Sequence, residues 1–111
     1  MTAAFNLNLL IRVNRELGGD FDLAAFAHRA VWNASAGRIE MHLVSRASHR
    51  VRVPAAAIDI TLEEGETIWT ESSYKYDDAE VARTLARAGF RVRAQWLDDA
   101  ARFALTLAEV P

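Results

Sequence analysis

The chain has 111 residues, of which 51% are hydrophobic and 25% are charged, and its formal net charge is −2. This length fits at most one domain of ordinary size and suffices to bury a core. The absence of cysteine excludes disulfides and thiolate metal sites. The balanced charge argues against nucleic-acid binding, and no apolar run approaches the roughly 20 residues that span a bilayer. The first residues lack the pattern of a signal peptide, so we expect a cytoplasmic protein.

The first segment, residues 2–17, predicts an amphipathic helix. Its large apolar residues recur at helical spacing and are Phe5, Leu9, Leu10, Val13 and Leu17. The pair Gly18-Gly19 predicts the end of this helix, because glycine adopts the left-handed cap conformation at little cost. Asp20 or Asp22 is expected to cap a further short turn over residues 23–26.

From Ala27 onward the apolar period changes from 3.6 to 2, which is typical of strands. Strands are predicted over residues 28–33, 38–46, 49–53, 58–63 and 66–73. The short links between them favour an antiparallel meander. Within residues 38–46, the side chains of Ile39, Met41 and Leu43 share one face.

A second helix is predicted over residues 77–88, and strands over residues 90–97 and 102–107. The expected fold class is therefore α+β, with an N-terminal helix, an antiparallel β meander, and then a helix and a β-hairpin. The boundary between these two parts is expected near residues 74–77.

Few residue patterns point to known chemistry. His28, His42 and His49 fall on separate strands without the spacing of metal ligands, so no metal site is expected. The sequence also has no Gly-x-Ser-x-Gly elbow of a hydrolase and no glycine-rich nucleotide-binding motif. No catalytic residue is assigned.

The polar stretch over residues 67–76 is the most distinctive segment. If it is a strand, Trp69, Glu71 and Ser73 lie on one face, with Glu71 and Ser73 about 7 Å apart along the backbone. A carboxylate and a hydroxyl so placed can bind the two nitrogens of a neutral imidazole, one as acceptor and one as donor. The alternative is a solvated glutamate on an edge strand, followed by a turn rich in serine and threonine.

Several stretches of the chain resemble one known family. They are Phe5 to Leu10 (FNLNLL), Ile11 to Asp22 (IRVNRELGGDFD), Ile39 to Leu43 (IEMHL), Thr70 to Tyr76 (TESSYKY), and a C-terminal series with Ala88-Gly89-Phe90, Trp96, Asp98 and Phe103-Ala104-Leu105. Together they resemble the histidine-specific N-α-methyltransferases of ergothioneine biosynthesis, in the right order and over essentially the whole chain. Leu7 stands where the family usually has a basic residue, and Ser72 where it often has an aliphatic one.

The resemblance implies a specific activity. Members of the family use S-adenosylmethionine to methylate the α-amino group of histidine three times, which gives hercynine. Residues 1–75 would be the C-terminal part of a substrate-binding lobe, and residues 76–111 the closing helix and β-hairpin of a Rossmann-like methyltransferase lobe. Glu71 and Ser73 align with the pair that holds the substrate imidazole. Met41 aligns with a residue that lines the imidazole pocket, although a purely structural role in a strand core is the alternative.

The resemblance also implies that the S-adenosylmethionine site lies upstream of Thr2. We therefore expect this chain to be a C-terminal fragment that binds histidine or a related amino acid, is inactive alone, and self-associates through surface that the missing part would cover. The alternative is a stand-alone, non-catalytic α+β module for binding or assembly.

Overall fold

A computed structural model describes residues 2–111. The chain divides into two compact units, Met1–Tyr74 and Lys75–Pro111. The sequence places the corresponding boundary between residues 75 and 76. The α+β class is confirmed, since helices and antiparallel strands occur in both units.

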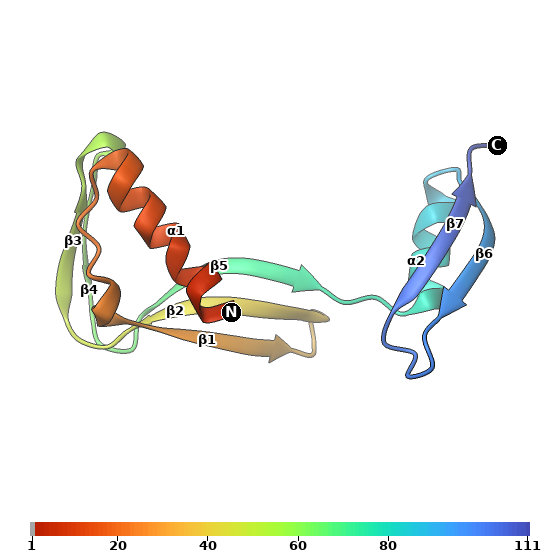
Figure 1. The fold of residues 1–111 in the computed structure, drawn as a ribbon, viewed down its shortest axis with the longest axis horizontal. Helices are drawn as coiled ribbons and strands as arrows, with labels where there is room; N and C mark the ends of the chain where they lie inside the picture. Colours follow the sequence, from red (N-terminus) through yellow and green to blue (C-terminus); the bar gives the residue numbers. More distant parts are fainter. Residues whose placement is uncertain (1) are drawn as a thin grey trace. The chain divides into compact units, whose positions relative to one another are not determined.

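The first unit contains one long helix and five strands (Figure 1). Its elements are α1 (Thr2–Leu17), a 3₁₀ helix (Leu23–Ala25), β1 (Phe26–Asn33), β2 (Arg38–Ser45), β3 (His49–Val53), a second 3₁₀ helix (Pro54–Ala56), β4 (Ile58–Leu62) and β5 (Thr67–Tyr74). Gly18 has a φ of 67° directly after α1, as its predicted role at the helix end requires. Of the two aspartates proposed to cap the short turn, Asp22 does so by accepting from the Ala24 amide.

The strand order differs from a simple meander in one respect. The strands β1, β2 and β5 form one sheet in that order, and β3 pairs with β4 in a separate hairpin that lies between β2 and β5 in sequence. Two backbone hydrogen bonds hold β5 beside β2: the Ser45 amide donates to the Glu66 carbonyl, and the Gly65 amide donates to the Ser45 carbonyl, each at 2.8 Å. Because β3 and β4 pair with each other and not with β2, the edge of β2 that does not pair with β1 is available to β5.

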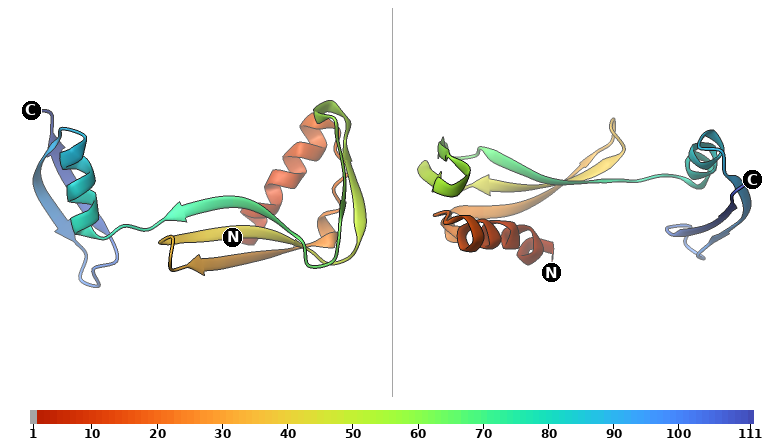
Figure 2. Two further views of the ribbon diagram at one scale, coloured as in Figure 1. Left: turned by 180° about the vertical axis from the view of Figure 1, so that it is seen from behind. Right: turned by 90° about the horizontal axis from the view of Figure 1, so that it is seen from above.

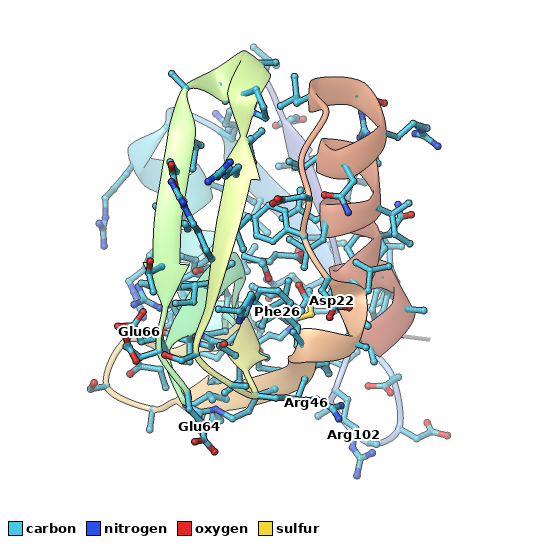
Figure 3. All side chains as sticks on the ribbon, turned by 90° about the vertical axis from the view of Figure 1, so that its left-hand side faces the viewer. Asp22, Phe26, Arg46, Glu64, Glu66 and Arg102 are labelled. Carbon is cyan, nitrogen blue, oxygen red and sulfur yellow. The ribbon has the colours of Figure 1, made fainter. Side chains whose placement is uncertain are left out.

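The core of this unit lies where α1 covers one face of the sheet and reaches the β3–β4 hairpin (Figure 2). Its buried members are Leu10, Phe26, Leu43, Val51, Val53 and Leu62. Figure 3 shows Phe26 between α1 and the hairpin strands, whereas Glu64 and Glu66 lie outside, at the turn between β4 and β5. Leu43 and Val51 have no exposed surface, so they anchor the sheet and the hairpin to one core.

The buried face of α1 is not the one that its largest apolar residues predict. Leu10 is buried and Val13 packs against the core, but Phe5 is 66% exposed and Leu9 is 45% exposed. In their place the helix buries Asn6, which is only 3% exposed. A buried amide is stable only when its hydrogen bonds are made, and the strands beneath α1 supply partners for Asn6.

The second unit consists of α2 (Asp78–Arg87) and the hairpin of β6 (Arg91–Leu97) and β7 (Ala104–Glu109). Asp77 caps α2: its side chain accepts from the Glu80 amide, and the Glu80 side chain accepts from the Asp77 amide. The helix packs on the hairpin, where Gln95 Nε2 donates to the Asp78 carbonyl at 3.0 Å.

Large apolar side chains of the hairpin remain exposed. Trp96 pairs with Leu105, and both are more than half exposed, as is Leu107 two residues further along β7. None of the described residues 75–111 is buried. Units shorter than about 40 residues rarely bury enough surface to be stable alone. This hairpin face, defined by Trp96, Leu105 and Leu107, is therefore an exposed apolar surface.

Candidate functional site

The structure brings the three candidate residues of the sequence together on one face of the β1–β2–β5 sheet. Met41 on β2 lies directly opposite Glu71 on β5, and Ile39 lies opposite Ser73. Directly opposed residues of an antiparallel pair share a face, and so do residues two apart on one strand. Met41, Glu71 and Ser73 are therefore neighbours, and the predicted pairing of Glu71 with Ser73 on one face is confirmed.

Trp69 does not share this face, so its predicted place beside Glu71 is wrong. The register shifts between Met41 and His42: Met41 pairs with Glu71, but His42 pairs with Trp69, which leaves Thr70 as an extra residue in β5. Such a β-bulge reverses the alternation of side chains along its strand. Trp69 instead stacks on the His42 ring, with ring centroids 5.9 Å apart.

A groove runs between α1 and β5 beside these residues. It has a volume of about 230 Å³ and is lined by Phe5, Asn6, Asn8, Leu9, Arg12, Thr70 and Glu71. Glu71 is exposed, and among the described residues its carboxylate makes no hydrogen bond or ion pair. An exposed carboxylate at the wall of a groove that also offers the apolar side chains of Phe5 and Leu9 is available to accept a hydrogen bond from a ligand.

Asn6 ties four elements together at the bulge. Its Nδ2 donates to the His42 carbonyl at 3.1 Å and to His28 Nδ1 at 2.9 Å. Its Oδ1 accepts from Thr70 Oγ1 at 2.6 Å, and the same hydroxyl lies 3.0 Å from the Met41 carbonyl. Because a carbonyl oxygen only accepts, the Asn6 atom that faces His42 must be the nitrogen. His28 Nδ1 must then act as an acceptor.

The opposite face of the sheet carries a separate polar cluster. Glu40 accepts from Arg38 Nε at 2.8 Å, from Asn33 at 3.1 Å and from His42 Nε2 at 3.1 Å. These hydrogen bonds, with that of Arg38 the strongest, lower the pKa of Glu40 to about 2. The Arg38 guanidinium also lies 4.5 Å from the centroid of the Trp69 ring. This cluster fixes β2 against β5 from behind the candidate site.

Sequence reasoning missed four residues of this region. Asn6 and Thr70 form the hydrogen-bonded centre of the bulge, and Ile39 and Trp32 continue the sheet face next to Ser73, because Trp32 pairs with Ile39. The one available signal was the position of Asn6, which stands four residues before the buried Leu10 and so on the same side of the helix. The two-residue period places Ile39 on the face of Met41 without assigning it to the site, whereas the positions of Thr70 and Trp32 depend on strand register.

The described residues contain no group of three or more histidine, cysteine, aspartate or glutamate side chains arranged to hold a metal ion. Within the same residues, neither helix has the length and apolar character needed to cross a membrane.

Comparison with known proteins identifies close relatives. Residues 1–110 match the family model described as "Histidine-specific methyltransferase, SAM-dependent". Over 108 residues the chain is 47% identical to the histidine N-alpha-methyltransferase of Mycolicibacterium smegmatis and 44% identical to that of Mycobacterium tuberculosis, covering 97% of this chain and 34% of each relative. It is also 30% identical over 94 residues to the L-tryptophan methyltransferase trpM of Psilocybe serbica, covering 82% of this chain and 26% of that protein. The chain spans about a third of the length of the histidine methyltransferases that it matches.

Proposed function

The chain belongs to the histidine-specific, SAM-dependent methyltransferase family, and from this membership we propose that it supplies the imidazole-binding part of an L-histidine N-α-methyltransferase. The observation that carries the proposal is the shared face of Met41, Glu71 and Ser73 beside an open groove. Trimethylation of the α-amino group, which yields hercynine for ergothioneine biosynthesis, is the proposed reaction of the longer protein.

The proposed binding chemistry follows from the groups present. A neutral imidazole has one N–H donor and one acceptor nitrogen. The Glu71 carboxylate accepts from the N–H, and the Ser73 hydroxyl donates to the other nitrogen. Met41 and Ile39 provide apolar contact for the ring face from the neighbouring strand. Tryptophan has a donor N–H only, so it cannot use both groups, and the pair favours histidine over an indole side chain.

The residues of this chain do not fit the cofactor. A nucleotide-like cofactor is typically held by a glycine-rich loop between a parallel strand and a helix. The described strands are all antiparallel, and Gly18, Gly37, Gly65 and Gly89 lie in helix ends and turns. We therefore assign the S-adenosylmethionine site to sequence N-terminal to these residues in the longer protein.

We propose that the unit Met1–Tyr74 is part of the substrate-binding lobe and that the unit Lys75–Pro111 closes the methyltransferase lobe. The exposed hairpin face of Trp96, Leu105 and Leu107 supports this division, since a further layer of protein would bury it. The same face also favours the alternative of a non-catalytic assembly module. On either account, the isolated chain is inactive.

The experiment places the chain in a complete enzyme. A chimaera in which these residues replace the matching segment of the Mycolicibacterium smegmatis relative is assayed for methyl transfer from labelled S-adenosylmethionine to histidine and to tryptophan. We expect methylated histidine as the product, little transfer to tryptophan, and none by the isolated chain. A chimaera that binds S-adenosylmethionine but neither binds nor methylates histidine would refute the proposal. That result would favour the alternative, in which the chain is a non-catalytic assembly module.

A further inference from the structure

The bulge in β5 determines which way Glu71 points. Without the extra residue Thr70, the alternation along β5 would put Trp69 and Glu71 on one face. With it, Trp69 stacks on His42 behind the sheet, while Glu71 lies opposite Met41 and lines the groove beside α1. If the extra residue were Glu71 instead of Thr70, Met41 would pair with Thr70 and Glu71 would lose its place opposite Met41.

The side chains that meet at the bulge are polar and matched to one another. Asn6 is 3% exposed, and its amide bonds to β1, β2 and β5 through His28 Nδ1, the His42 carbonyl and the Thr70 hydroxyl. The Thr70 hydroxyl has one proton and faces two acceptors, Asn6 Oδ1 at 2.6 Å and the Met41 carbonyl at 3.0 Å. The Met41 carbonyl belongs to the last residue of β2 before the register shift. The contacts of the Thr70 hydroxyl with Asn6 and with this carbonyl therefore lie at the bulge itself.

Moving the bulge would break this set of bonds. With Trp69 as the extra residue, Thr70 would pair with His42 and its hydroxyl would turn away from Asn6; with Glu71 as the extra residue, Thr70 would pair with Met41 and its contacts to Asn6 and to the Met41 carbonyl would change. Buried polar atoms that lose their partners in this way are costly. The alternative registers are therefore disfavoured by the same side chains that line the groove. Asn6 holds the register from the helix, and Thr70 holds it from the strand.

We propose that Asn6 and Thr70 are positioning residues for substrate recognition: their hydrogen bond fixes the β5 bulge and thereby aims Glu71 at the substrate ring. This inference rests on the proposed function, because it assumes that Glu71 binds the imidazole. It assigns no contact between substrate and either Asn6 or Thr70. Their effect on binding passes through Glu71.

The test uses Thr70→Val, which keeps the side-chain shape but removes the hydroxyl, in the chimaera described above. We expect the KM for histidine to rise about five- to tenfold, the scale of one lost hydrogen bond, with the KM for S-adenosylmethionine unchanged. Thr70→Ser restores the hydroxyl and should return the KM to within about twofold of the parent value. Thr67→Val removes an exposed threonine hydroxyl from the same strand and should have no effect.

The effect of the Thr70 substitutions on the position of Glu71 is measured on the isolated chain by NMR. Met41 and Glu71 are cross-strand neighbours, so nuclear Overhauser contacts between their side chains are expected in the parent chain and in Thr70→Ser, and should weaken in Thr70→Val. If Thr70→Val does not bind S-adenosylmethionine in the chimaera, Thr70→Ala replaces it with the same expected split between the two KM values.

Two results separate this inference from the proposed function. If Glu71→Gln raises the KM for histidine but Thr70→Val leaves it within twofold of the parent value, the positioning role is wrong and the imidazole role stands. If Glu71→Gln leaves the KM for histidine unchanged, the proposed function itself fails. Equal increases of both KM values in Thr70→Val would also overturn the positioning role, because they would indicate a general loss of structure.

Discussion

Met41 and Glu71 face each other across strands β2 and β5, on the side of the sheet that α1 covers. The two residues are 30 positions apart in sequence, and the β3–β4 hairpin lies between them. Their juxtaposition depends on the pairing of β2 with β5 and on the bulge at Thr70. The groove beside them is the feature on which the proposed recognition of an imidazole rests.

Acid should destabilise the first unit through Glu40. Its pKa of about 2 in the folded chain lies below its ordinary value of 4.5, so its hydrogen bonds stabilise the fold above about pH 4.5, and this contribution disappears as the pH falls toward 2. Glu40→Gln should therefore be less stable than the parent at pH 6, and the two stabilities should converge near pH 2. Urea unfolding followed by circular dichroism between pH 2 and 6 measures both.

The comparison with Glu40→Gln is needed because hydrogen bonds from arginines also lower the pKa values of Glu16 and Asp59. The parent and Glu40→Gln share the contributions of Glu16 and Asp59, so the difference between their free energies of unfolding reports on Glu40 alone. Parallel stability curves for the two chains would contradict the assignment.

Leu43 is expected to be the most sensitive aliphatic position of the β1–β2–β5 sheet. It has no exposed surface and lies in the core between α1 and the sheet. Leu43→Ala should lower the free energy of unfolding by about 2–5 kcal/mol, measured by urea denaturation. Leu17→Ala, at a leucine that is 41% exposed, is the matched control and should change it by less than about 1 kcal/mol. A similar decrease in the free energy of unfolding in both variants would contradict the central place of Leu43 in the core.

The isolated chain is expected to self-associate through the hairpin face of Trp96, Leu105 and Leu107. Burial of exposed leucine and tryptophan side chains is favourable at roughly 25 cal/mol per Å². Multi-angle light scattering should therefore show species larger than the 12.4 kDa monomer, and the double variant Leu105→Glu with Leu107→Glu should reduce them. The same double change at Arg83 and Arg87, two exposed α2 positions, is the control. A parent chain that stays monomeric at high concentration would contradict this prediction.

Local patterns predicted most of the elements because helix and strand periods are written in short stretches of sequence. The helix α1 begins and ends where its apolar spacing and Gly18 indicate, and Asp77 marks the start of α2. Glu71 and Ser73 share a face because nothing interrupts the two-residue period between them.

Features that depend on contacts between distant residues were not predictable in the same way. The pairing of β2 with β5 joins strands separated by a whole hairpin. The bulge is stabilised by Asn6, 64 residues away from Thr70, so the local sequence around Trp69 gives no sign of it. The same long-range bonds explain why α1 buries Asn6 and leaves Phe5 exposed.

The most direct test of the central claim is the affinity of the Glu71→Ala chimaera for histidine, measured by calorimetry beside its affinity for S-adenosylmethionine. A hydrogen bond to a charged group contributes about 1.5–3 kcal/mol, so the Kd for histidine should rise at least about tenfold while the Kd for S-adenosylmethionine stays within twofold. An unchanged affinity for histidine, or equal losses for both ligands, would contradict the role of Glu71 in holding the imidazole.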